Sequence, residues 1–307
     1  MKSYNLKYKI PYLLISVFIS LFLVFNFCQA AILYLEPSVG SYYRGEIFIV
    51  ETRIDVENEC INTVEANLSF SPDILETIDF SQGNSILTLW VKSPTVEQKS
   101  GSISFIGGIP GGYCGKLSGE PGENNLLGKI IFKIKEIDEE KQTGVNFVEG
   151  SRVLLNDGFG TPAKVTTKGA IFTILTEKIG LPKDEWQKEL EKDNVPPELF
   201  EIEIHQEPSI FDGKYFISFS TTDKQTGIDY YEIKEGKGDW KKVSSPYLLE
   251  DQSLQGKILV KAVDKAGNER IAEYSPLRKP FPYLMLLATI VALVIIGWII
   301  RKLKIKK

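Results

Sequence analysis

The residue types that carry most enzyme and metal chemistry are scarce in this chain of 307 residues. It contains one histidine, His205, and three cysteines, Cys28, Cys60 and Cys114. Nucleophilic catalysis needs a base beside the nucleophile, usually a histidine, and structural zinc needs four ligands. The sequence therefore predicts no catalytic residue and no zinc centre. A glycoside hydrolase is the remaining enzymatic alternative, because a pair of the abundant acidic residues would suffice for it.

Asn156 and Asp157, which precede Gly158, offer oxygen ligands of the kind that calcium prefers. No EF-hand spacing surrounds them. The same three residues are also typical of a turn that its own side chains close. We therefore predict no cofactor, and keep calcium at Asn156 and Asp157 as the alternative to a plain turn.

Aromatic side chains are candidates for non-covalent binding, because flat rings can stack on sugars or anchor a protein partner. Five of them are expected at loop or strand ends: Tyr42, Tyr43, Trp90, Tyr113 and Phe159. Trp90 continues an apolar run and Tyr113 adjoins Cys114, so both also fit a core position. A protein partner would instead suit a mixed charged face, for which Lys129 and Lys133 are the candidates.

Both ends of the chain carry targeting patterns. Residues 1–30 read as a signal peptide, with three early lysines, an apolar stretch and a cleavage position after Ala30. A lipidated Cys28 and an uncleaved leader are the alternatives. Residues 281–300 form a predicted transmembrane helix, since 282–300 carry no charge, and the tail 301–307 holds five cations. This asymmetry predicts a single-pass protein of the cell membrane, with its tail in the cytoplasm and the rest outside.

The charge balance excludes one class of partner. Without the three leader and five tail cations, 28 Lys and Arg stand against 40 Asp and Glu, an excess of 12 acids. Such a surface repels phosphate backbones, so we expect no nucleic-acid partner. Once Cys28 is removed with the leader, Cys60 and Cys114 are the only cysteines in an oxidising compartment. They are expected to form a disulfide.

The elements that must position these residues are strands. From residue 32 to residue 175, apolar and polar residues alternate in about nine short runs separated by Gly, Pro, Asn and Ser. One of these runs is residues 86–91, and another, 102–106, precedes a glycine-rich insertion at 107–122. This pattern favours a sandwich or jelly roll. The fold class is therefore expected to be all-β.

Beyond this domain, residues 176–197 are expected to form a linker with a short helix, bounded by Pro182 and by a proline pair at 196–197. The edge of the first domain is an equally consistent interpretation of this stretch. Residues 198–276 return to strands, about seven of them, and an immunoglobulin-like β-sandwich fits their spacing. The turn at 264–268 is expected to place Gly267 and Asn268 at positive φ.

The first domain, residues 32–175, resembles the cohesin module, a jelly-roll β-sandwich. The likeness rests on the segments 35–40, 66–76, 125–134 and 153–158, which occur in the family's order. The segment 66–76 has Ser71-Pro72 where the family usually has Asp-Pro. The resemblance implies capture of a dockerin-like protein module. Carbohydrate-binding modules of the same superfamily match nearly as well and imply a polysaccharide ligand, with a link to polysaccharide catabolism.

The second domain resembles bacterial immunoglobulin-like or fibronectin-type modules through the hairpin at 260–268. Such modules are usually spacers, and the resemblance implies a fold and no activity. The sequence therefore predicts a membrane-anchored surface protein that is not an enzyme, whose first domain binds a polysaccharide or a dockerin-like module. A structural envelope or adhesion protein without a specific glycan ligand is the alternative.

Overall fold

The computed structural model describes residues 30–57, 59–115, 125–176, 181–276 and 282–304. The expected leader therefore lies outside the described residues, apart from Ala30. The chain forms two compact units. Unit 1 comprises the chain up to Val195 together with Thr222–Ile228, and unit 2 comprises Pro196–Thr221 and the chain from Asp229 onward.

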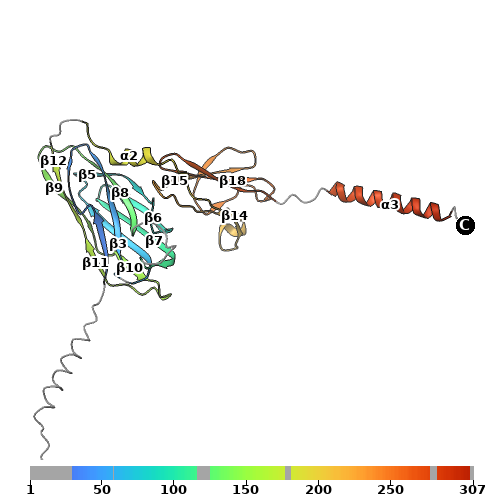
Figure 1. Cartoon of the computed structure of the whole chain (residues 1–307), viewed down its shortest axis with the longest axis horizontal. Coiled ribbons are helices and arrows are strands. Elements are labelled where there is room, and N and C mark those ends of the chain that lie inside the picture. Colours follow the sequence, from blue (N-terminus) through green and yellow to red (C-terminus); the bar gives the residue numbers. More distant parts are fainter. Residues whose placement is uncertain (1–29, 58, 116–124, 177–180, 277–281, 305–307) are drawn as a thin grey trace, which may run out of the picture. The chain divides into compact units, whose positions relative to one another are not determined.

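Unit 1 contains two β-sheets, named here sheet A and sheet B (Figure 1). Sheet A has the strand order β11-β1-β3-β8-β5. Its strands are β1 (Ala31–Glu36), β3 (Ile47–Asp55), β5 (Leu75–Ser81), β8 (Leu126–Ile134) and β11 (Val165–Lys168). Sheet B has the order β2-β12-β9-β4-β7-β6, and β10 also pairs with β4. Its strands are β2 (Val39–Tyr43), β4 (Ile61–Phe70), β6 (Leu89–Glu97), β7 (Ser102–Tyr113), β9 (Lys141–Phe147), β10 (Arg152–Leu155) and β12 (Ala170–Leu175).

The core of unit 1 lies between these sheets, and strands such as β4 and β12 bury every second side chain in it. Phe48, Phe105, Phe132 and Phe172 are the largest fully buried side chains. The rings of Phe48 and Phe172 meet edge to face, with centroids 5.2 Å apart. The alternating pattern of the sequence thus leads to the expected β-sandwich.

Two chain segments serve both sheets. β1 belongs to sheet A, and after Pro37 the chain continues as β2 at the edge of sheet B. β11 and β12 repeat this switch near the end of the unit, with β11 parallel to β1 and β12 parallel to β2. β1 pairs with β3 only up to Glu51, so the first half of β3 has no strand on that side.

β6 and β7 depart from the strands expected here. β7 continues through Gly107 and Gly108 as far as Tyr113, where the sequence predicted an insertion from residue 107. Glycine is required at position 107, because a Cβ atom there would lie 2.6 Å from the Leu87 side chain. β6 runs from Leu89 to Glu97 rather than over 86–91, since Ile86 and Leu87 are buried in the core ahead of it.

Helix α2 (Glu185–Lys192) lies in the segment expected to be a linker, and it packs on sheet A. Asp184 caps its N-terminus by accepting a hydrogen bond from the Gln187 N–H. Trp186 is 7% exposed and clusters with Ile49 of β3 and Ile131 of β8. The helix is therefore an integral part of unit 1.

The approach to α2 also caps the unpaired half of β3. The Ile47 N–H donates to the Lys183 carbonyl at 2.9 Å, and the Ile49 N–H donates to the Glu185 carboxylate at 3.1 Å. Both N–H groups would otherwise face outward from an incomplete edge. A backbone carbonyl and a side chain thus take the place of a neighbouring strand.

The segment 222–228 completes unit 1 through buried polar contacts. The Thr226 hydroxyl donates to the Asp193 carboxylate at 2.6 Å, and the Ser81 hydroxyl donates to the Thr226 carbonyl at 2.7 Å. Asp223 accepts from three backbone N–H groups of the same segment. The backbone passes so close to Gly83 that a Cβ atom there would lie 2.1 Å from the Gln225 carbonyl oxygen.

Unit 2 contains a sheet with the order β13-β14-β17 and another with the order β16-β15-β18-β19. Its strands are β13 (Glu203–Gln206), β14 (Tyr215–Ser218), β15 (Ile228–Glu235), β16 (Lys241–Val243), β17 (Tyr247–Leu248), β18 (Ile258–Asp264) and β19 (Glu269–Tyr274). Ile217 and Phe219 cluster with Ile233 and Val260 in its core. In the turn before β19, Gly267 has positive φ, while Asn268 donates its N–H to Asp264.

The last element is α3 (Pro282–Lys304), whose side chains are described for residues 286–302. Within the described part of the chain, we find no helix that is long and apolar enough to cross a membrane.

Candidate functional site

The outer face of sheet A is partly covered. α2 lies over Ile47, Ile49 and Ile131, the apolar part of that face. At the rim of this contact the Lys129 ammonium lies 2.7 Å from the Glu189 carboxylate, and the Lys129 side chain is only 12% exposed. This corrects the expectation that Lys129 presents its charge to a partner. Lys133, on the same strand, is exposed.

The outer face of sheet B is open in the part of the chain that the structure describes, and no described helix packs on it. β4, β7, β6 and β9 lie side by side here, and β12 and β2 continue the sheet. Glu65, Lys92 and Glu97 place charges on this face, and Leu89 and Ile171 are exposed apolar residues of it. The other outward side chains are mostly small and uncharged. They include Ser69 and Asn67 of β4, Ser102 and Ser104 of β7, Thr95 of β6, Asn146 and Gln142 of β9, Thr173 of β12 and Ser41 of β2.

These side chains share one face because the strand register places them opposite one another. Asn67 pairs with Ser104, and Ser104 pairs with Thr95 on the next strand. Neighbouring strands lie about 4.8 Å apart, so such rows form a flat array of hydrogen-bonding groups. The charges on this face include Arg152, which pairs with Glu65 at 2.6 Å.

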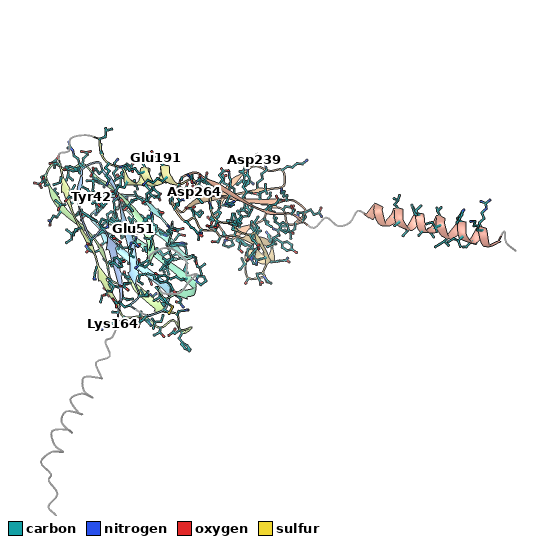
Figure 2. The ribbon with its side chains drawn as sticks, in the orientation of Figure 1. Tyr42, Glu51, Lys164, Glu191, Asp239 and Asp264 are labelled. Atoms are coloured by element: carbon teal, nitrogen blue, oxygen red, sulfur yellow. A yellow bond between two sulfur atoms is a disulfide. The ribbon has the colours of Figure 1, made fainter. Side chains whose placement is uncertain are left out.

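Three aromatic candidates pack into the core of unit 1. Trp90 meets Phe105 edge to face, with centroids 5.8 Å apart. Tyr42 stacks on Phe48 with centroids 4.0 Å apart, and Figure 2 shows it toward the same end of the unit as α2. Tyr113 is only 8% exposed. None of these three rings is laid out as a stacking surface for a sugar.

Burial raises the pKa of Tyr42 to about 12, and the nearby carboxylates of Glu185 and Glu46 act in the same direction. The neighbouring Tyr43 is half-buried, and its backbone N–H donates to the Glu46 carboxylate at 3.0 Å. Phe159 differs from all the others, since it is 91% exposed.

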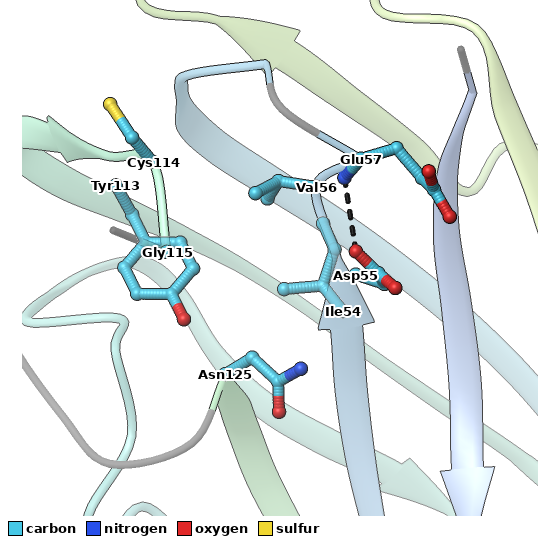
Figure 3. A pocket seen from close by; sticks show the side chains of 8 residues that line it. All are labelled: Ile54, Asp55, Val56, Glu57, Tyr113, Cys114, Gly115 and Asn125. Carbon is cyan, nitrogen blue, oxygen red and sulfur yellow. Dashed lines mark hydrogen bonds between the residues drawn. The ribbon is translucent and has the colours of Figure 1, made fainter.

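Cys60 and Cys114 form the expected disulfide, with Cα atoms 4.2 Å apart. They flank the paired residues Ile61 of β4 and Tyr113 of β7, so the bridge fastens two neighbouring strands of sheet B. Beside the bridge lies a pocket of about 290 Å³ (Figure 3). Tyr113, Val56 and Asn125 are among the side chains that line it.

Asn156 and Asp157 form a turn. The Asn156 amide donates to the Gly111 carbonyl at 3.1 Å, and Asp157 accepts from the Phe159 N–H at 2.8 Å. Hydrogen bonds from Thr161 and from the Phe159 N–H lower the pKa of the Asp157 carboxyl. Among the described residues, no cluster of three acidic, histidine or cysteine ligands includes Asp157.

His205 lies on β13 in unit 2, where its ring stacks on Phe216. Its Nε2 atom is 2.8 Å from the Ser218 hydroxyl and 3.4 Å from the Glu203 carboxylate. In a serine hydrolase the carboxylate binds the other ring nitrogen, so that Nε2 is free to accept the proton of the serine. Here serine and carboxylate share one nitrogen, which is not that arrangement.

Sequence reasoning missed the open face of sheet B. The serine, threonine and amide residues of this face lie on separate strands and form no common sequence motif. Asp193 and Thr226 were also missed, because a sequence separation of 33 hides the contact. The available signal was the alternation itself, since it already assigned Asn67 and Ser69 to the outer side of a strand.

Comparison with known proteins gives structural neighbours only. No family model and no curated protein sequence matches the chain. The similar solved structures include the sixth cohesin of scaffoldin B from Acetivibrio cellulolyticus, solved with a dockerin. It is 14% identical and matches over 48% of this chain and 100% of its own, with a TM-score of 0.38.

A type I cohesin named OlpC from Clostridium thermocellum, also solved with a dockerin, is 15% identical. The match covers 48% of this chain and 96% of that one, with a TM-score of 0.39. The seventh ScaB type I cohesin from Pseudobacteroides cellulosolvens is 16% identical over 49% of this chain and 95% of its own, with a TM-score of 0.39. These neighbours are cohesins, and each matches about half of this chain.

Proposed function

We propose that unit 1 is a non-catalytic recognition module that binds a dockerin-like protein through the outer face of sheet B. The observation that carries this proposal is the difference between the two faces of the sandwich. Sheet A is partly covered by α2, while the flat array of small polar side chains on sheet B stays open. Such an array offers many hydrogen bonds and little steric obstruction to a protein surface.

A protein partner fits this face better than a polysaccharide. Binding of a glycan chain on a flat face calls for exposed rings, and Trp90, Tyr42 and Tyr113 are packed into the core. A catalytic function finds no support either, because the Ser218, His205 and Glu203 cluster lacks the required geometry. The partner class itself comes from the cohesin-like pattern in residues 32–175.

We further propose that a membrane anchor and a spacer hold unit 1 at the cell surface. The uncharged stretch 282–300 and the cations of 301–307 support a membrane anchor with an outer ectodomain. The seven strands of unit 2 and its hairpin at 260–268 support an immunoglobulin-like spacer. External protease on intact cells should then release the ectodomain and leave a small basic fragment. Full protection of residues before 281 would contradict this orientation.

The binding proposal is tested with residues 31–276 against a panel of dockerin modules in a surface-binding assay. Asn67→Arg with Ser104→Arg places two bulky cations in the middle of the sheet B face. We expect at least a tenfold loss of affinity, about 1.4 kcal/mol. Lys133→Glu on sheet A is the matched control and should leave binding unchanged. Raising the salt concentration should also have little effect, because the charges of the face, Lys92 and Arg152 against Glu65 and Glu97, balance.

Two results would assign the binding site to another face or the ligand to another class. If Lys133→Glu weakens binding while the sheet B pair does not, the partner docks on sheet A. If no dockerin binds, but the fragment retains an insoluble polysaccharide and the sheet B pair of substitutions abolishes this retention, the partner of the sheet B face is a glycan. Thermal unfolding of each variant, compared with that of the unmodified fragment, separates loss of binding from loss of fold.

A further inference from the structure

The uncovered half of sheet A contains a surface hollow of about 540 Å³. Its floor comes from β1, and Pro37, Ser38 and Val39, where the chain leaves sheet A, form part of its wall. Asp55 from β3 and Lys168 from β11 also line it. This volume falls in the range of small-molecule sites, which is roughly 300–1,000 Å³.

The strand register arranges the outward side chains of the hollow in rows. Tyr34 stands between Lys168 on one side and Arg53 on the other. In the next row Ile32 stands beside Asp55. From the spacing of strands and residues, the Cα atoms of Lys168 and Asp55 lie about 12 Å apart. Their side chains can therefore reach the two ends of a ligand about as long as a disaccharide.

Three polar groups of the hollow can form further hydrogen bonds. Among the contacts of the described residues, Lys168 makes no ion pair, and its side chain is exposed. Asp55 accepts one hydrogen bond, from the Glu57 N–H at 3.0 Å, through Oδ1. The ammonium can donate to a ligand, and the carboxylate can accept from it. The Ser38 hydroxyl, on the wall, can do either.

The other charges at the hollow gather around Arg53. The Glu36 carboxylate lies 2.9 Å from the Arg53 guanidinium. The same guanidinium also pairs with the Glu51 carboxylate, so Glu36, Glu51 and Asp55 stand against Arg53 and Lys168. Three carboxylates against two cations leave an excess of one negative charge, which disfavours an anionic ligand and is compatible with a neutral one.

Apolar surface lies between these polar groups. Tyr34 is half-buried, and its hydroxyl is held by the Asn125 amide at 3.2 Å. Ile32 lies beside it, and Val39 is an exposed apolar side chain on the wall. A ring with C–H groups on its faces and hydroxyls on its rim matches this combination, because carboxylate and ammonium groups form strong hydrogen bonds with hydroxyls.

We infer that this hollow is a binding site for a neutral saccharide of one or two rings, separate from the protein-binding face on sheet B. Asp55 accepts hydrogen bonds from ligand hydroxyls, Lys168 donates to ligand oxygens, and Tyr34 with Ile32 supports the apolar side of a sugar ring. The site requires no catalysis and no metal.

The test uses the full chain and defined probes, namely cellobiose, maltose and diacetylchitobiose, in saturation-transfer NMR. A shallow, open site is expected to bind at millimolar concentration, so titration runs to about 10 mM. Lys168→Met should weaken the bound probe about tenfold. Lys164→Met is the matched control: Lys164 is exposed four residues away, does not line the hollow, and its replacement should change nothing.

Further variants keep the inference open to refutation. Asp55→Ala should also lower affinity, with unfolding temperature measured alongside, whereas Asn67→Arg with Ser104→Arg on sheet B should leave saccharide binding intact. Absence of transfer to all three probes would overturn the inference, as would equal loss with Lys164→Met. Stronger, salt-sensitive binding of cellobiouronic acid than of cellobiose would show that the hollow selects an anion instead.

Discussion

The outer faces of the two sheets of unit 1 differ in what covers them. Sheet A buries part of its face under α2 through Trp186, and it leaves the rest as a hollow lined by charged groups. Sheet B has no described cover, but the Cys60–Cys114 bridge fastens β4 to β7. The comparison shows that the open face is mostly polar, whereas the part of sheet A under α2 is apolar.

The largest loss of stability is expected when the disulfide of sheet B is removed. Cys60→Ala with Cys114→Ala should lower the free energy of unfolding of unit 1 by about 4 kcal/mol, because the bridge closes a loop with a sequence separation of 54. Denaturant unfolding with and without reductant measures this. An unchanged midpoint in both forms would mean that sheet B is held by packing alone, like sheet A.

Sheet A should respond almost as strongly to the loss of its cover. Trp186→Ala removes the side chain that α2 buries against Ile49 and Ile131, and should cost about 3 kcal/mol of unfolding free energy. Lys188→Ala, on the exposed side of the same helix, is the control. If both variants unfold at the same denaturant concentration, α2 does not stabilise sheet A and the contrast between the faces disappears.

A smaller effect is expected at the end of β5, where the segment 222–228 meets sheet A. Gly83→Ala would bring a Cβ atom within 2.1 Å of the Gln225 carbonyl oxygen, so backbone must move at a cost of about 1–3 kcal/mol. Gly108→Ala on sheet B meets only ordinary contacts and serves as the control. Equal stabilities of the two variants in thermal unfolding would refute the close packing of this segment.

The smallest effect concerns alkaline pH at the edge of sheet B. The pKa of Tyr42 is raised from its ordinary 10.0 to about 12 in the folded chain, so its stabilising contribution is present below pH 10. That contribution is lost as pH rises toward 12, because only the unfolded chain ionises readily there. Unfolding free energies of Tyr42→Phe should fall less over this range than those of the unmodified chain. Parallel curves would show no shift.

Much of the fold could be predicted because it depends on local alternation. The inward Val64, Ala66, Leu68 and Phe70 of β4 follow directly from a period of two. The extension of β7 could not be foreseen, because glycines at 107 and 108 usually indicate a break, and here Gly107 gives room to Leu87. Local composition suggested a break, whereas the close packing of Leu87 requires a glycine within the strand.

The candidate sites show the same limit. The disulfide followed from the cysteine count, whereas the positions of Trp90 and Tyr113 depended on what packs beside them. Lys129 alternated correctly to the outer side of β8, yet its partner Glu189 comes from a helix 60 residues away. Alternation can assign a side chain to a face, but it cannot tell whether that face is later covered.

The groups that cap the first half of β3 also affect association between copies of this chain. The Ile47 and Ile49 N–H groups are occupied by the Lys183 carbonyl and the Glu185 carboxylate. An uncapped strand rich in β-branched residues is a template on which another molecule can add a strand of its own. A chain ending before residue 182 would uncover these donors together with Ile131. The start of α2 and the residues before it thus also block the edge at which an intermolecular sheet would grow.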